Sequence, residues 1–146
     1  MSLEENKALI ERFLEEIPNK GNASAIDELV SPDFKLYVPG DPHPHDREAF
    51  LQFVHQRRTA FAGFHDHVEE WFIEEDKVAI RVTVSGVHQG DFQGIAPTGK
   101  PISVTAYASY HIAGGKLTEM RFLLDVFRVL EQVGATSGSV QSLEGM

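Results

Sequence analysis

The stretch that decides the fold is VAIRVTVSGV, residues 78–87. Apolar side chains occupy every second position from Val78 to Val84, and mostly small or polar side chains stand between them. A period of two is typical of a β-strand with one face on a core. The same period predicts three more long strands, over residues 65–74, 102–112 and 117–127. Turn residues in the links, such as Gly114-Gly115, favour antiparallel pairing because parallel strands need long crossovers.

The first part of the chain has helical periodicity instead. Apolar residues recur at helical spacing after Ser2, after Asn22 and after Asp46, and all three are residue types that cap helix N-termini. Pro18 and Gly21 are predicted to end the first helix, and Pro32 limits the second. A short strand is expected around residues 34–38, where apolar and other side chains alternate.

Helices first and strands afterwards predict an α+β fold. We expect three N-terminal helices packed on a strongly curved, mostly antiparallel sheet, with Gly86 and Gly90 marking bulges that bend it. A bent sheet closed by helices encloses a pocket. The predicted domain spans residues 1–134. Residues 135–146 have little to bury and are expected to form a flexible C-terminal tail.

The composition excludes several classes of protein. A formal net charge of −9 disfavours nucleic acid and anionic membrane surfaces as partners. The chain has no cysteine, which excludes disulfides, thiol catalysis and cysteine-ligated zinc. No apolar run reaches membrane-spanning length, and the N-terminus lacks the pattern of a secretory signal, so we expect a cytoplasmic protein.

A single carboxylate, Asp125, interrupts the apolar run FLLDVF at residues 122–127. A carboxylate held in an apolar pocket has a raised pKa, which would make Asp125 a general base near neutral pH. In that case apolar neighbours such as Leu123 should lie beside it. The alternative is that Asp125 caps a short helix that follows, by accepting hydrogen bonds from free backbone N–H groups.

Four other residues are candidates for the same pocket. His88 extends the apolar face of its strand and is either a functional group or a hydrogen-bonded core histidine. Arg121 is either a ligand contact or an exposed strand cation. Tyr107 lies in a strand with small residues, one face of which borders the expected cavity, and Trp71 is either a cavity wall or part of the core.

The sequence predicts no metal and no cofactor. His43 with His45 and His65 with His67 have the spacing of ligand pairs, but no third ligand is fixed by spacing. Phosphate-binding loops, dinucleotide fingerprints and nucleophile elbows are missing from the sequence.

The chain resembles the SnoaL-like polyketide cyclases, within the nuclear-transport-factor-2-like (NTF2-like) superfamily. The resemblance covers residues 6–134, and its most specific part is residues 88–100. The segments that carry it are NKALI (6–10), SPDF (31–34), DKVAIR (76–81), GVHQGDFQGIAPTGK (86–100) and LEQVG (130–134).

This resemblance implies an α+β cone with a deep apolar pocket, and frequent homodimers. In characterised cyclases an aspartate matching Asp125 removes a proton from the substrate, and the enolate closes a ring by intramolecular aldol condensation without a cofactor. The histidine matching His88 recurs, with a less settled role. A tryptophan is usual where this chain has Arg121, which implies a more polar pocket floor. The Asp-Arg-Asp site of the related limonene-epoxide hydrolases has no counterpart in residues 102–112.

Three hypotheses follow. The first is a cofactor-free enzyme in which Asp125 abstracts a proton next to a carbonyl, for cyclisation or isomerisation, while His88 or a tyrosine hydroxyl stabilises the enolate. The second is a non-catalytic binding module for a small hydrophobic ligand. The third is an interaction domain with a filled interior that dimerises through its sheet. For the first, we expect Arg121, Tyr107, Trp71 and Leu123 to contact a small carbonyl-containing substrate.

Overall fold

The computed structural model describes residues 2–134, so the predicted tail lies outside the described residues. Helix α1 (Leu3–Leu14) begins at Ser2, whose side chain accepts from Glu5 N while the Glu5 side chain accepts from Ser2 N. This is the capping box that the sequence predicts. Helix α3 (Arg47–Ala60) begins at Asp46, whose carboxylate accepts from Ala49 N at 2.8 Å, also as predicted.

The segment between these helices differs from the prediction. Pro18 does not end the first helix, because α1 continues as a wider π-helical segment, η1 (Glu15–Asn19). Asn22 makes no capping hydrogen bond, because its Oδ1 accepts from the Ser24 hydroxyl rather than from a backbone N–H. The second helix is short: a 3-10 turn, η2 (Ala23–Ala25), leads into α2 (Ile26–Leu29).

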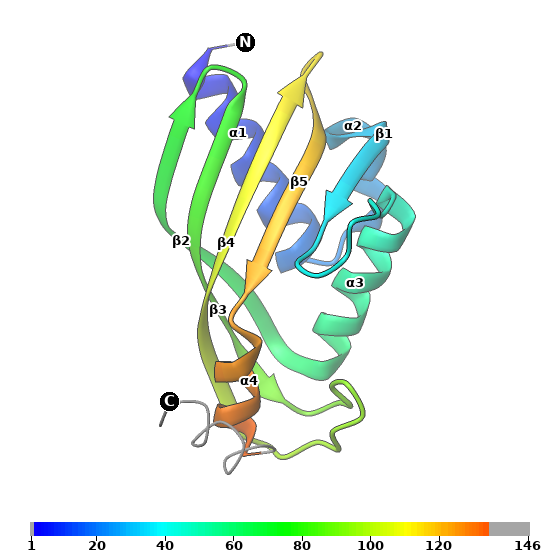
Figure 1. The fold of residues 1–146 in the computed structure, drawn as a ribbon, viewed down its shortest axis with the longest axis vertical. Coiled ribbons are helices and arrows are strands. Elements are labelled where there is room, and N and C mark those ends of the chain that lie inside the picture. The colour runs from blue at the N-terminus through cyan, green and yellow to red at the C-terminus, as the bar shows by residue number, and fades with distance from the viewer. Residues whose placement is uncertain (1, 135–146) are drawn as a thin grey trace.

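Five strands form one sheet in the order β1-β5-β4-β3-β2 (Figure 1). They are β1 (Val30–Tyr37), β2 (Phe61–Glu74), β3 (Lys77–His88), β4 (Pro101–Ala113) and β5 (Lys116–Leu124). Only the β1–β5 pair is parallel, and the other pairs are antiparallel. The predicted α+β fold with a curved, mostly antiparallel sheet is therefore confirmed.

The last predicted strand is too long. Strand β5 ends at Leu124, and helix α4 (Val126–Val133) follows after one residue. Phe122, Leu124 and Val126 continue the period of two, so the alternation hides the change from strand to helix.

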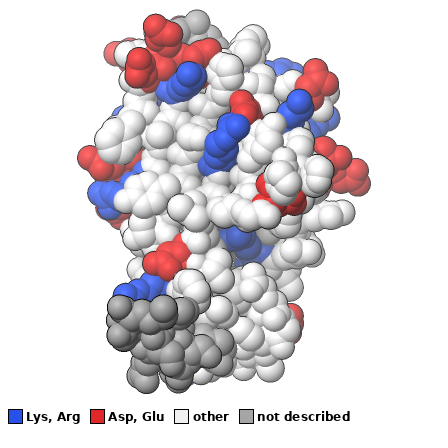
Figure 2. Space-filling view, in the orientation of Figure 1, with Lys and Arg blue, Asp and Glu red and all other residues white. Residues whose placement is uncertain are grey.

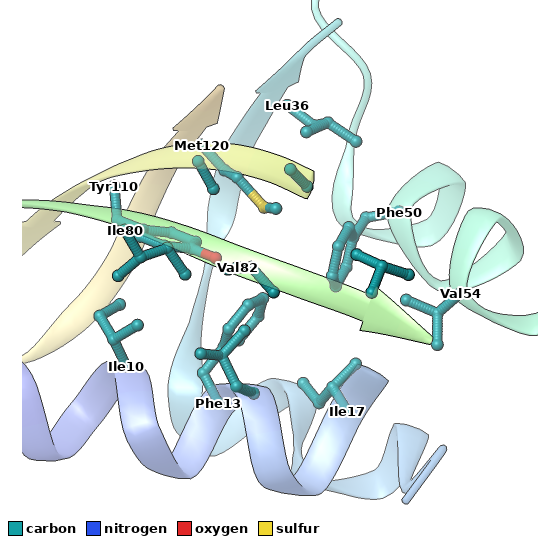
Figure 3. Packing of buried hydrophobic residues seen from close by; sticks show 14 of the residues in the cluster. Ile10, Phe13, Ile17, Leu36, Phe50, Val54, Ile80, Val82, Tyr110 and Met120 are labelled. Carbon is teal, nitrogen blue, oxygen red and sulfur yellow. The ribbon is translucent and has the colours of Figure 1, made fainter. Parts of the chain in front are cut away.

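The core fills the space between α1, α3 and one face of the sheet, and in Figure 1 α1 lies behind the strands. Figure 3 shows Ile10 and Phe13 of α1 and Ile17 of η1 packed beneath β3 and β4. The buried side chains of β3 are those of the predicted apolar face, from Val78 to Val84. In residues 2–134, no helix is long and apolar enough to cross a membrane.

Candidate functional site

A cavity of about 380 Å³ lies between the inner face of the sheet and helices α1 and α3. Its walls are mainly aromatic and aliphatic, and they include Phe13, Phe50, Phe64, Val82 and Met120. A pocket of this size that is mostly apolar suits a small organic molecule, with the few polar groups fixing its orientation. The ionisable side chains that line it are Asp66, Arg57 and Tyr110.

The position of each of these three side chains follows from the apolar pattern of the helix or strand that carries it. Arg57 continues the inward face of α3, because Phe50, Phe53, Val54 and Arg57 follow one another at helical spacing and all line the cavity. Asp66 stands in β2 two positions after Phe64, on the same face. Tyr110 projects from β4 into the core, with its hydroxyl among the apolar side chains (Figure 3).

The Asp66 carboxyl is the most perturbed acid in this cavity. Burial raises its pKa from 3.8 to about 6, and nearby Arg57 and His65 oppose the rise only in part. Oδ1 of Asp66 is inaccessible to solvent, and within residues 2–134 it has no hydrogen-bond partner. An acid with a pKa near 6 is partly protonated close to neutral pH, which is the range in which a general base works well.

Arg57 and Tyr110 are the two ionisable hydrogen-bond donors among the described residues that line the cavity, and the Gln93 amide is a third, neutral donor. The Arg57 guanidinium lies over the Phe122 ring, 5.2 Å from its centroid. Burial lowers the Arg57 pKa, and among the described residues no carboxylate oxygen lies within 4.0 Å of it. Burial and the charge of Asp66 both raise the pKa of Tyr110, so this hydroxyl stays protonated.

Asp125 lies elsewhere. It is exposed and forms the N-cap of α4, with Oδ1 accepting from Arg128 N at 3.1 Å. Leu124 and Val126 line the cavity, but the side chain between them does not. The prediction that Asp125 sits in an enclosed apolar pocket is therefore wrong, because the strand ends one residue before it. The alternative, a helix cap, is what the structure contains.

His88 is fully buried but does not line the cavity. Its Nδ1 lies 3.0 Å from Thr98 Oγ1 and accepts from Thr98 N at 3.3 Å, while Nε2 is buried and has no partner in the described part of the chain. The ring contacts Phe61, at 5.5 Å between centroids. This geometry matches the interpretation of a hydrogen-bonded core histidine, which closes the loop from Gln89 to Lys100.

Arg121, Tyr107 and Leu123 come together, but on the outer face of the sheet. We use this term for the face opposite α1, which carries a shallow groove of about 460 Å³. Tyr107 and Leu123 are paired across β4 and β5, and each is about half exposed. The Arg121 guanidinium stacks on Tyr37 at 4.5 Å and contacts Glu119. Of the three, only Leu123 also borders the interior cavity.

Trp71 is partly buried against the core, and Lys7 of α1 lies over its ring at 5.4 Å. It lines neither the cavity nor the groove. The predicted substrate contacts Trp71, Arg121 and Tyr107 therefore lie outside the cavity. Strands β4 and β5 turn Tyr107 and Arg121 to the outer face, whereas Trp71 lies on the α1 side of the sheet, where it packs against the core beyond the cavity. In residues 2–134, no three His, Asp or Glu side chains come together as metal ligands.

Asp66 and Arg57 are not among the residues predicted from the sequence, although the sequence holds a signal for each. Arg57 stands at the seventh position after Phe50, where a helix stripe places a core residue. Asp66 falls between Phe64 and Val68 in a period of two. The polar neighbours His65, His67 and Glu69 made this part of the strand look solvated.

Comparison with known proteins agrees with the fold. The family model of the SnoaL-like polyketide cyclases matches residues 8–133. AclR, a proposed hydroxylase from Streptomyces galilaeus, is 28% identical with a TM-score of 0.81, over 91% of this chain and 98% of that chain. IdmH, a proposed polyketide cyclase from Streptomyces antibioticus, is 27% identical with a TM-score of 0.79, over 88% and 98%.

A SnoaL-like protein from Jannaschia sp. CCS1 shares the fold at 22% identity, with a TM-score of 0.82 over 90% of this chain and 93% of that chain. No curated protein matches the chain. The family match spans nearly all of the described residues, and the sheet, helices and interior cavity agree with it. The chain belongs to the SnoaL-like polyketide cyclase family.

Proposed function

We propose that this protein is a cofactor-free enzyme that uses Asp66 as a general base on a small, mostly apolar carbonyl compound. One observation carries the proposal: a carboxylate whose Oδ1 has no hydrogen-bond partner among the described residues lines a mostly apolar cavity. Buried polar groups in proteins are nearly always paired, and the exceptions concentrate at functional sites. The family membership and the proposed cyclase among the similar structures support the same class of reaction.

The reaction would begin with transfer of a proton from the carbon next to a carbonyl to the Asp66 carboxylate. The negative charge then moves from Asp66 to the enolate oxygen of the substrate. Arg57 and the Tyr110 hydroxyl are the cavity groups that can stabilise that oxygen, by charge and by a hydrogen bond. The total charge of the cavity stays constant during this step, so no new charge has to be buried.

Two outcomes of the enolate are compatible with the cavity. Attack of its carbon on a second carbonyl of the same molecule closes a ring, and the new alkoxide recovers the proton from Asp66. Return of the proton to a different carbon gives an isomer instead. Both routes use the same base and require no metal or cofactor group. The size of the cavity favours a substrate with one or a few rings.

The test is deuterium exchange into a simple probe ketone, 2-tetralone, followed by NMR in heavy water. The wild-type protein should accelerate exchange next to the carbonyl. Asp66→Asn keeps the shape of the side chain and removes the base, so acceleration should fall by about 10²–10⁴-fold. Arg57→Gln should also reduce the rate, because the enolate would lose its cation.

Asp125→Asn is the matched control. Asn caps helices as well as Asp does, so this variant changes the other proposed base without disturbing α4. We expect Asp125→Asn to exchange at the wild-type rate. Loss of activity in Asp125→Asn with full activity in Asp66→Asn would return the role of the base to Asp125 and refute the proposal.

The second candidate is a binding module for a small hydrophobic ligand, favoured by the many apolar side chains of the cavity. It predicts that the wild-type protein binds 2-tetralone, measured by calorimetry, without accelerating exchange. Under this alternative Asp66→Asn should bind the probe as well as the wild type or better, since a charged group leaves the cavity.

A further inference from the structure

Asp66 stands on an edge strand, and a side chain takes the place of the missing neighbour strand. Strand β2 is last in the sheet order, so its backbone is paired only with β3 on one side. At Asp66 the Asn19 amide supplies a partner on the other side. Asp66 N donates to Asn19 Oδ1 at 2.7 Å, and Asn19 Nδ2 donates to Asp66 O at 3.1 Å.

Asn19 reaches this position because α1 does not stop at Leu14. The π-helical segment η1 carries the chain five residues further and ends at Asn19, directly after Pro18, which lines the cavity. Lys20 N donates to Glu15 O at 3.0 Å, which is the wide hydrogen-bond spacing of a π-turn. Such turns often mark functional positions in helices.

Asn19 is itself held by α3. Arg58 Nη1 donates to Pro18 O at 3.0 Å and also to Asn19 O. Gly21 leaves space for this guanidinium, because a Cβ at that position would lie 2.5 Å from Arg58 Nε. Consecutive residues of α3 thus act on the site: Arg57 enters the cavity, and Arg58 fixes the residue that holds Asp66.

We propose that Asn19 is a positioning residue, whose two hydrogen bonds hold the Asp66 carboxylate inside the cavity. The inference rests on the proposed function of Asp66. Because β3 holds β2 on one side and Asn19 holds it on the other, the strand cannot rotate at Asp66 and bring the carboxylate to solvent. The alternative is a purely structural contact, like that of Gln132, whose amide makes the same pair of bonds to Ser103 N and O at 2.8 and 3.0 Å.

The two interpretations differ in what happens to the Asp66 carboxyl. Burial is the main cause of its raised pKa, and Arg57 from α3 and His65 from β2 act against it. Tyr110 of β4 is the other titratable group near it. If Asn19 keeps the carboxylate inside, loss of the two bonds should let water reach it and lower its pKa.

The experiment is a carboxyl-carbon NMR titration of Asp66 in the full chain, without any ligand. Asn19→Leu preserves the approximate shape and removes both hydrogen bonds. We expect the Asp66 pKa to fall by at least about one unit in this variant. Gln132→Leu removes the equivalent pair of bonds at β4 and should leave the Asp66 pKa at its wild-type value. The amide of Asp66 should exchange with heavy water faster in Asn19→Leu only.

The outcomes separate this inference from the proposed function. An unchanged Asp66 pKa in a folded Asn19→Leu protein would overturn the positioning role while leaving Asp66 as a base. An Asp66 pKa near 4 in the wild type would instead remove the premise of the proposed function. If Asn19→Leu does not fold, Arg58→Lys keeps the charge and removes the guanidinium contacts to Pro18 and Asn19. Arg58→Lys should also lower the Asp66 pKa, and an unchanged Asp66 pKa in this variant would also overturn the inference.

Discussion

At the scale of single residues, Asp66 should make the protein less stable at neutral pH than at mildly acidic pH. Its pKa in the folded state is about 6, above its ordinary value of 3.8. Between these two values the folded protein binds more protons than the unfolded chain, so the free energy of unfolding falls as pH rises. Above about pH 6 the cost is complete, because the carboxylate is then ionised in both states.

Asp66→Asn removes the loss of stability that the ionised Asp66 carboxylate causes. We expect the variant to be more stable than the wild type by about 1–3 kcal/mol at about pH 7.5, and nearly equal to it at about pH 4. Urea denaturation of both proteins at the two pH values measures the difference, and the titrations of other groups cancel in it. A wild type that is more stable than Asp66→Asn at both pH values would show that the carboxylate is paired in solution.

The residue scale is also where the sequence is least informative about the site. His88 was predicted to point inward, and it does, because it extends the apolar face of β3. Whether an inward side chain meets a cavity or solid core depends on how the helices close over the sheet. Periodicity carries no such information. It therefore could not separate His88, which is packed against Phe61, from Asp66, which lines open space.

At the scale of elements, Asp125 stabilises the start of α4. The Asp125 carboxylate accepts a hydrogen bond from the first turn of α4, which satisfies a backbone N–H that has no partner within the helix. Asp125→Ala should lower the free energy of unfolding by about 1 kcal/mol, and Asp125→Asn should restore nearly all of it. Urea denaturation at neutral pH measures both. Equal losses in the two variants would mean that the carboxylate charge matters rather than the cap.

The long elements were predictable because each buries one face. Strands β2 to β4 and helix α3 follow their expected periods, and turn residues separate them. The error at the end of β5 occurs because two patterns share residues there. Val126 completes the alternation of β5, and it also opens the helical spacing Val126, Val129, Val133. Only the capping geometry at Asp125 separates strand from helix there.

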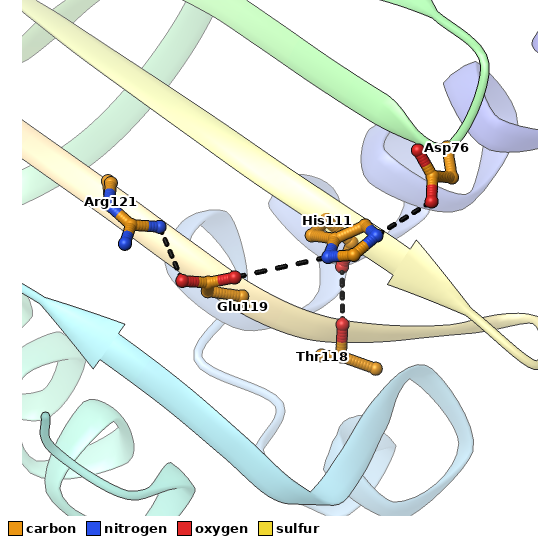
Figure 4. A network of polar contacts seen from close by, with 5 residues as sticks. All are labelled: Asp76, His111, Thr118, Glu119 and Arg121. Atoms are coloured by element: carbon orange, nitrogen blue, oxygen red, sulfur yellow. Dashed lines mark hydrogen bonds and ion pairs between the residues drawn. The ribbon is translucent and has the colours of Figure 1, made fainter.

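At the scale of the whole molecule, the outer face of the sheet differs from the rest of an acidic protein. Phe72 and Tyr107 are each about half exposed there, beside Leu123. A row of polar contacts crosses this face: Figure 4 shows it running from Arg121 through Glu119 and His111 to Asp76. Figure 2 shows this side of the molecule, with broad uncharged areas between its charged groups.

We propose that two copies of the chain associate through this outer face. Apolar side chains are rarely left exposed as a group on a monomer, and burial of this face between two copies would cover Phe72, Tyr107 and Leu123. Light scattering at micromolar concentration should give twice the 16.3 kDa mass of one chain. Tyr107→Glu places an unpaired charge in the contact and should shift the mass towards that of one chain.

Leu3→Glu is the matched control for this experiment. Leu3 is also about half exposed, but it lies at the start of α1 and outside the groove, so its variant should stay dimeric. Dissociation should leave deuterium exchange of the probe ketone intact, because Asp66, Arg57 and Tyr110 all come from one chain on the opposite side of the sheet. A wild-type protein of single-chain mass would refute the dimer. A Tyr107→Glu protein that is monomeric and also inactive would show that the cavity depends on the second copy.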